Sequence, residues 1–205
     1  MKCCKKFISI LGSCALMIVI FTITSFASNI PSEFNNEMAT NKNAIAFKAT
    51  NVIEQKTDKG YEISFDLIQE ADTKGTIATR AIGWVQAGDG KVKLDLAPAN
   101  GIGFFDWYFS LSNGDLITSV KSTMLVEKDL IGPVNPNYAK VDIYRSYKKG
   151  TQYNKAQDSH AFSFPGNVSY NQNIIFRWTV FTVQGVQHTY YMPSGSKQGK
   201  VCDFI

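Results

Sequence analysis

The stretch GFFDWYFSLSNGDLITSVKSTMLV, residues 103–126, carries the clearest structural pattern in the chain. Apolar and polar residues alternate on both sides of Asn113-Gly114, a pair that favours the positive φ angles of a two-residue type I′ turn. Alternation with a period of two is typical of a β-strand that buries one face. The stretch therefore predicts a β-hairpin that turns at Asn113-Gly114.

The register of this hairpin decides which side chains are buried. With the turn fixed, Phe105, Trp107 and Phe109 share one face of the first strand, and Asp106 and Tyr108 lie on the other. A slip of one residue would expose all three large rings to water, so the register is strongly specified. We expect the three rings in the core and the polar face in solvent.

The rest of the chain repeats the period-two pattern in short segments with turn signals between them. Strands are expected at residues 45–49, 61–67, 81–85, 91–96, 161–164, 174–183 and 187–191, with turns at 57–60 and 88–90 and a loose tail at 193–200. No segment shows a stronger helical period. This pattern predicts an all-β fold, an antiparallel β-sandwich that is most simply immunoglobulin-like, with a jelly roll or a small barrel as alternatives.

The expected turn at Gly88-Asp89-Gly90 leaves the position of Trp84 open. A two-residue turn at Asp89-Gly90 places Trp84 on a polar face, as an exposed aromatic residue. A bulge or a longer loop at the same glycines returns Trp84 to the core, and this is the reading we favour.

The N-terminus has the features of a secretory signal peptide. Three lysines precede an apolar run at residues 7–26, and Ser25-Phe26-Ala27 has the small residues of a cleavage site. We expect a signal peptide at 1–27, a flexible polar linker at 28–43 and one domain at 44–205. The alternatives are an uncleaved anchor across a hydrocarbon core of about 30 Å, or a lipoprotein cut before Cys14.

Removal of the signal peptide changes both the charge and the cysteine content of the 205-residue chain. Residues 1–27 hold three lysines and no acidic residue, so the net charge falls from +4 to +1. A nearly neutral chain has no overall attraction to nucleic acid or to an anionic membrane, and we expect neither as a partner after export. Cys202 alone remains, so no disulfide can form within the mature chain.

Sequence motifs for catalysis or for a bound metal are weak. His160 lies close to Asp158, but no nucleophile motif accompanies them. Asp95 and Asp106 could meet on neighbouring strands and act as a carboxylate pair. No clustered ligands indicate a metal site and no glycine-rich loop indicates a nucleotide site, so we expect no catalytic residue, no metal and no cofactor.

The most distinctive polar segment lies between residues 138 and 155, where tyrosines alternate with lysines and an arginine. Tyrosine offers a flat apolar face and a hydroxyl, while lysine attracts anions, and the combination suits a sugar, a wall polymer or a protein surface. The alternative is an edge strand whose lysines discourage aggregation. The candidate ligand-binding residues are Tyr144, Tyr147, Lys148, Lys149 and Trp84.

Taken together, the lysine-led signal, the Asn- and Lys-rich composition and the hairpin with Phe105-Asp106-Trp107-Tyr108-Phe109 and Asn113-Gly114 give the chain a general resemblance. It resembles the small, uncharacterised, secreted all-β proteins of low-GC Gram-positive bacteria. The resemblance implies an extracellular compartment and an all-β fold, and it transfers no catalytic motif.

These observations favour a secreted, non-catalytic binding module that acts at or near the bacterial cell surface. Its expected partners are a cell-wall polymer, a carbohydrate or an extracellular protein. The alternative is a small secreted hydrolase that uses carboxylates or His160. The two hypotheses predict different sites, since binding needs an exposed aromatic patch and hydrolysis needs ionisable groups that converge in a cleft.

Overall fold

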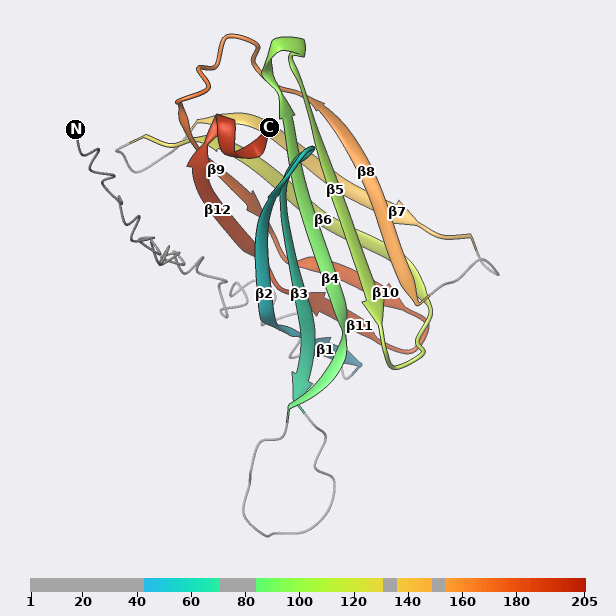
Figure 1. Ribbon diagram of the computed structural model, residues 1–205. Helices are drawn as coiled ribbons and strands as arrows, with labels where there is room; N and C mark the ends of the chain where they lie inside the picture. The colour runs from blue at the N-terminus through green and yellow to red at the C-terminus, as the bar shows by residue number, and fades with distance from the viewer. Residues whose placement is uncertain (1–42, 71–83, 131–135, 149–153) are drawn as a thin grey trace, which may run out of the picture.

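Two β-sheets packed face to face form the protein (Figure 1). The computed structural model describes residues 43–70, 84–130, 136–148 and 154–205. The expected all-β sandwich is confirmed, while the finer immunoglobulin-like arrangement stays a prediction. The signal peptide, all but the last residue of the linker and the start of the strand expected at 81–85 lie outside the described residues.

The first sheet has five antiparallel strands in the order β2-β3-β4-β5-β8. Its strands are β2 (Lys48–Thr57), β3 (Gly60–Glu70), β4 (Trp84–Ala97), β5 (Ile102–Leu111) and β8 (Lys155–Ser163). The expected turn at 57–60 joins β2 to β3, where Thr57 pairs with Gly60. The three central strands, β3, β4 and β5, alternate between buried and more exposed residues, so this sheet has one core face and one outer face.

The second sheet has seven strands built around β6. This strand pairs with β7 along one side, and with β10 and β9 in succession along the other. The strands are β1 (Ala44–Ala46), β6 (Ile117–Lys128), β7 (Asn137–Ser146), β9 (Asn173–Trp178), β10 (Phe181–Gly185), β11 (Thr189–Met192) and β12 (Gly195–Lys200). The β1 and β11 pair is parallel, so the sheet is mixed.

The helices of the described residues are two short 3-10 turns, η1 (Pro98–Asn100) and η2 (Val201–Phe204). Within these residues, no helix is long and apolar enough to cross a bilayer. The fold therefore depends on sheet pairing and on the packing between the sheets.

Aromatic rings from both sheets meet in the centre of the core. Phe105, Trp107 and Phe109 of β5 are at most 2 % exposed, which confirms the expected core face. Phe181 of β10 contacts all three rings, with centroid distances of 6.5, 5.7 and 4.7 Å respectively. Rings of this size contribute most of the apolar area that a core buries, so these contacts hold the two sheets together.

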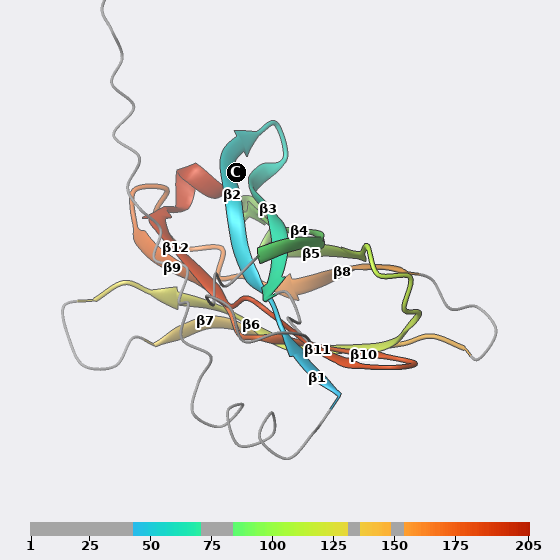
Figure 2. The same ribbon diagram turned by 90° about the horizontal axis from the view of Figure 1, so that it is seen from below.

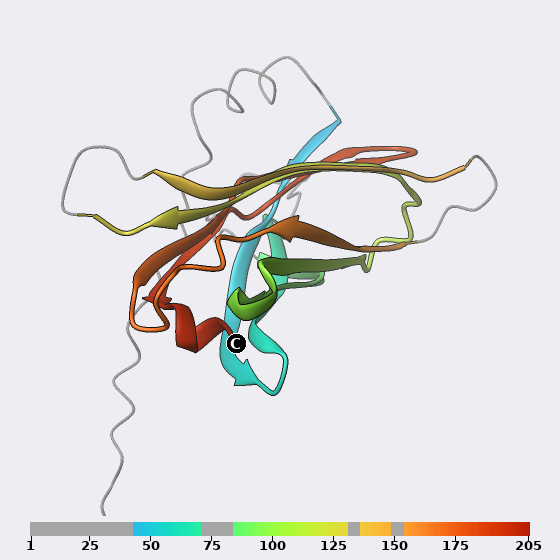
Figure 3. The same cartoon turned by 90° about the horizontal axis from the view of Figure 1, so that it is seen from above.

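The predicted hairpin at Asn113-Gly114 is wrong in its pairing. Strand β5 pairs with β4 and β8, whereas β6 belongs to the other sheet. The chain crosses from one layer to the other after β5 (Figure 3). Gly114 has a φ of 75°, but Asn113 is not among the residues with positive φ, so no type I′ turn forms. Facing each other across the core, the apolar sides of β5 and β6 bury more surface than they would side by side.

The predicted turn at Gly88-Asp89-Gly90 is also wrong, because all three residues lie inside β4. A Cβ atom at Gly90 would lie 2.4 Å from the ring of Phe65. Glycine is therefore needed here for the close approach of a core ring, not for a turn. The pairing of β3 with β4 shifts register between Leu67 and Ile68, and Trp84 begins the strand.

Phe47 marks a second crossing between the sheets. It separates β1, in the seven-stranded sheet, from β2, in the five-stranded sheet (Figure 2). Its ring is 3 % exposed and stacks on Tyr190, with 5.4 Å between centroids and 9° between planes. Its backbone N–H donates to the carbonyl of Tyr191. Phe47 therefore fixes the first strands to both layers.

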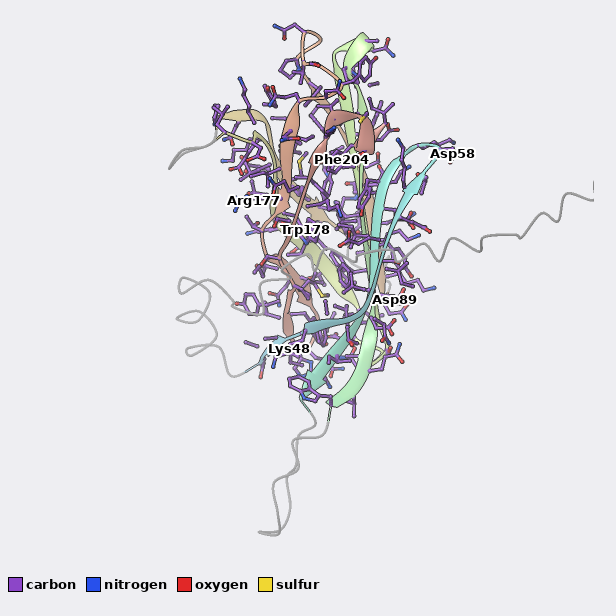
Figure 4. The ribbon with its side chains drawn as sticks, turned by 60° about the vertical axis from the view of Figure 1, so that its left-hand side comes forward. Lys48, Asp58, Asp89, Arg177, Trp178 and Phe204 are labelled. Carbon is purple, nitrogen blue, oxygen red and sulfur yellow. The ribbon has the colours of Figure 1, made fainter. Side chains whose placement is uncertain are left out.

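The C-terminal residues are ordered, so the expected loose tail at 193–200 is wrong. Strand β12 pairs with β9 from Gly195 to Lys200. The following η2 turn buries Phe204 completely, against Phe176 and Tyr61 (Figure 4). The polar residues of this segment suggested a loose tail. Backbone pairing with β9 and the burial of one ring are enough to order it.

Removal of the Phe47 ring tests the importance of the crossing. We expect Phe47→Ala to lower the free energy of unfolding by about 3–5 kcal/mol, because it leaves a cavity between the layers. Ile53→Ala on β2 is the control, since Ile53 is 60 % exposed, and it should cost less than about 1 kcal/mol. Urea denaturation followed by tryptophan fluorescence measures both, and equal costs would contradict the assignment.

Candidate functional site

The predicted contact residue Tyr144 lies on the outer face of the seven-stranded sheet. It is 62 % exposed, and the Nζ atom of Lys121 lies 5.6 Å from the centre of its ring. This pair gives one aromatic residue beside one positive charge, but the lysine comes from β6 and is neither of the predicted contacts Lys148 and Lys149.

Tyr147 lies on the other side of the chain, half-buried against the core. Burial raises the pKa of its hydroxyl, although the Gln157 backbone and Arg145 act in the opposite direction. Lys148 is exposed, and Lys149 lies outside the described residues. Tyr144 and Tyr147 therefore do not form one patch.

Trp84 is 42 % exposed, and the Lys48 Nζ atom lies 4.1 Å from its ring centre. The favoured reading, in which a bulge returns Trp84 to the core, is wrong. As the first residue of β4, Trp84 lies at one end of the five-stranded sheet, and Tyr144 lies on the other sheet. The sequence-predicted contacts are thus divided among separate surfaces.

His160 does not have the surroundings of a catalytic base. Its Nε2 atom lies 3.8 Å from Asp158 Oδ2, so the structure brings the two residues together. The same atom is buried and has no hydrogen-bond partner among the described residues, so no hydroxyl is held in position for attack. Asp158 also forms an ion pair with Arg145, in which Nη1 lies 3.6 Å from Oδ2. This ion pair joins β7 to β8.

Asp95 and Asp106 share the outer face of the five-stranded sheet, as the sequence allows. Asp106 pairs with Lys93, and Asp95 with Phe104 one step along the strands. Burial raises the pKa of Asp95, Lys93 opposes the rise, and Asp106 adds to it. Asp106 already accepts a hydrogen bond from the Ser159 hydroxyl at 2.5 Å. Because Asp106 is already hydrogen-bonded, the two carboxylates do not form a pair in which one is free to act as general acid and the other as general base.

The outer face of the five-stranded sheet carries a continuous row of side chains across all five strands. Cross-strand pairing aligns Ile53, Ser64, Lys91, Tyr108 and Gln157, one from each strand. Ser64, Lys91 and Tyr108 face outward because both sequence neighbours of each are buried. Ile53 and Gln157 face the same side because they pair with Ser64 and Tyr108. Tyr108, on β5, is the aromatic residue of the row.

Two hollows adjoin this row and share Lys91, Tyr108 and Gln157 as lining residues. The larger has a volume of about 720 Å³ and the smaller about 440 Å³. The larger extends toward Asp106, and the smaller toward Asp89, which lies on this side of the sandwich (Figure 4). Both volumes fall within the range of about 300–1,000 Å³ that is typical of ligand sites.

Every carboxylate in the two hollows already has a partner in the chain. The pairs are Glu62 with Lys91 at 3.1 Å, Asp158 with Arg145, Asp106 with Ser159, Asp89 with Ser110, and Asp66 with Asn51 at 2.7 Å. By contrast, the side chains of Ser64, Tyr108 and Gln157 make no hydrogen bond to any described residue. Apart from Lys93, which forms no ion pair with the described residues, the groups free to meet a ligand are therefore uncharged donors and acceptors.

The sequence contains part of the signal for this site. The alternation through Phe105, Trp107 and Phe109 places Tyr108 on the outer face, and we expected it there without assigning it a role. Ser64, Lys91 and Gln157 come from three other strands, and only the register brings them beside Tyr108. The strand register cannot be predicted from residue spacing alone.

A second cluster of ionisable groups surrounds Asp115, which follows Asn113-Gly114 and is 3 % exposed. Its carboxylate accepts hydrogen bonds from the Tyr190 hydroxyl and from four backbone N–H groups, those of Leu116, Val186, Gln187 and His188. The Nδ1 atom of His188 lies 3.6 Å away. Because these donors occupy the carboxylate, its role is to fasten the crossing after β5 to the turn between β10 and β11.

The donors around Asp115 also control its protonation. Burial alone would raise its pKa, but the Tyr190 hydroxyl and the backbone N–H groups of Gln187, His188 and Leu116 outweigh burial and hold the pKa below its ordinary value. Burial and the Asp115 carboxylate in turn raise the pKa of Tyr190. The ionised carboxylate is thus the form that the fold stabilises.

No protein family, curated protein or solved structure matches the chain. The described ranges also contain no group of three or more His, Cys, Asp or Glu side chains that could hold a metal ion. What the outer face of the five-stranded sheet can bind therefore follows from its own geometry.

The Asp115 cluster gives a pH-dependent prediction. We expect Asp115→Asn to lower the free energy of unfolding by about 3 kcal/mol near neutral pH, because buried N–H groups lose a charged acceptor. The carboxylate contributes its stability above its unfolded pKa of about 3.9 and loses it as the pH falls through the lower folded pKa. The difference between wild type and variant should therefore shrink in acid.

Urea denaturation at a series of pH values measures this difference. Asp142→Asn is the control, since the side chain of Asp142 is 71 % exposed and, among the residues that the structure describes, pairs with Lys140 and Thr123. A cost for Asp115→Asn that stays constant from neutral pH to below pH 3 would show that the charge of Asp115 is not what stabilises the fold.

Proposed function

We propose that the protein is a secreted, non-catalytic binding module that acts at or near the bacterial cell surface. The observation that carries this proposal is the open outer face of the five-stranded sheet, where Tyr108 and Gln157 offer polar groups with no partner in the described chain. A half-buried aromatic residue among free donors and acceptors suits recognition. The apolar N-terminal stretch with its cleavage site supports export.

Binding is a better account of this face than hydrolysis. A hydrolase of the carboxylate class needs one acid and one base free to act on a bond. The acidic side chains of the hollows, Glu62, Asp66, Asp89, Asp106 and Asp158, are each engaged by a neighbouring side chain instead.

Export has a direct test. When the gene is expressed in a Gram-positive host, we expect the protein in the medium or on the cell surface. Its intact mass should be that of a chain that begins at Ser28. Mass spectrometry of the cell and medium fractions measures this. A chain that stays in the cytoplasm with its first 27 residues would contradict secretion.

Binding is tested by sedimenting the secreted protein with insoluble Gram-positive cell wall, before and after the anionic polymers are stripped, at low and high salt. We expect the protein to bind, and we expect Tyr108→Ala to reduce the bound fraction at least tenfold. Tyr170→Ala is the matched control, because it removes an exposed tyrosine that belongs to neither candidate surface, and Tyr144→Ala tests the opposite sheet. No binding under any of these conditions would contradict the proposal.

The same experiment separates the two candidate surfaces. Tyr144, Tyr147, Lys148, Lys149 and Trp84 stay predictions as contact residues. Loss of binding in Tyr144→Ala, with Tyr108→Ala unaffected, would move the site to the outer face of the seven-stranded sheet. A protein that coprecipitates with the module in place of the wall would identify a protein partner and contradict the polymer ligand.

A further inference from the structure

We infer that the ligand is an uncharged carbohydrate chain, long enough to occupy both hollows and to pass over Tyr108 between them. This inference rests on the binding function proposed above and names the class of ligand. It follows from the extent of the site, from its charge balance and from the chemistry of its free groups.

The extent of the site indicates a chain and not a single sugar. The row from Ile53 to Gln157 crosses five strands, and strands lie about 4.8 Å apart, so it spans about 19 Å. The smaller hollow reaches Ile53 at one end, and the larger reaches past Gln157 to Arg145 on β7. Since Lys91, Tyr108 and Gln157 line both hollows, a ligand can continue from one into the other.

The charge of the site disfavours a charged polymer. The larger hollow has three cationic residues, Lys91, Lys93 and Arg145, and three anionic ones, Glu62, Asp106 and Asp158. Lys91 and Arg145 are engaged with carboxylates. An anionic ligand would have to separate these ion pairs and would meet the repulsion of the carboxylates, so the site gives it little advantage.

The free groups match sugar hydroxyls. Tyr108 and Ser64 have hydroxyls that donate and accept, and Gln157 has an amide that does both. Tyr108 also carries an aromatic ring that is only half-buried, and such a ring can pack against the C–H face of a sugar while its hydroxyl stays wet. Phe104, 40 % exposed, is a second aromatic residue on the same face, four residues before Tyr108.

The test is calorimetric titration of the secreted protein with oligomers of N-acetylglucosamine and of glucose, from one to six units. We expect one series to bind, with an affinity that rises with length and then levels off once both hollows are filled. The Kd should change less than twofold between low and high salt, because no net charge is exchanged.

Three variants assign the binding to this face. Tyr108→Ala should raise the Kd for the longest oligomer at least tenfold. Tyr108→Phe should retain part of the affinity because the ring remains. Tyr170→Ala should leave the Kd unchanged, because Tyr170 is 53 % exposed and lies between β8 and β9, away from both hollows. The same thermal midpoint for all the variants would exclude unfolding as the cause.

Three outcomes would overturn the inference. The first is tight, salt-sensitive binding of polyglycerol phosphate in preference to both sugar series. The second is sugar binding that Tyr108→Ala does not weaken, and the third is wall binding without any sugar binding. In each case the protein still binds, so the proposed binding function survives, whereas a protein that binds neither wall nor sugar would fail both.

Discussion

The stacking of β5 against Phe181 is the constraint on which the rest of the structure depends. Once Phe105, Trp107 and Phe109 are committed to the core, the pleat of the strand leaves Asp106 and Tyr108 on the outside. Pairing with β4 and β8 then transfers the same orientation to the neighbouring strands. The composition of the outer face is therefore set by packing on the inner face, and the two hollows are a consequence of how the core is filled.

The sandwich also depends on how the chain passes between its layers. At one crossing the Phe47 ring is buried against Tyr190, and at another the Asp115 carboxylate collects backbone N–H groups from the opposite sheet. Tyr190 takes part in both, through its ring and its hydroxyl. Because Cys202 is the single cysteine beyond the N-terminal apolar run, these noncovalent contacts do the work that a disulfide does in many small exported domains.

Alternation in the sequence was enough to predict the β-sandwich and the buried face of β5, because those properties are local. It could not predict strand pairing, since an apolar face on β5 and another on β6 is equally compatible with one sheet or with two facing sheets. Gly88-Asp89-Gly90 was misread as a turn because the reason for its glycines, the Phe65 ring, lies on another strand. Tyr144 and Tyr147 are three residues apart, and an odd spacing on an extended chain turns two side chains to opposite sides. The division of that patch was therefore present in the sequence.

The alternation along β3, β4, β5 and β8 separates the positions that build the core from the positions that form the outer face. Ser64 and Lys93 each lie between two buried residues, and Gln157 follows the buried Ala156, yet none of the three is itself part of the core. Exchanges at such positions change stability little, by about 0.5 kcal/mol or less in most proteins. The outer face can accordingly diversify by single substitutions while the sandwich stays intact, and the same scaffold could be selected in the laboratory for new specificities, with residues 53, 64, 93, 108 and 157 as the positions to randomise.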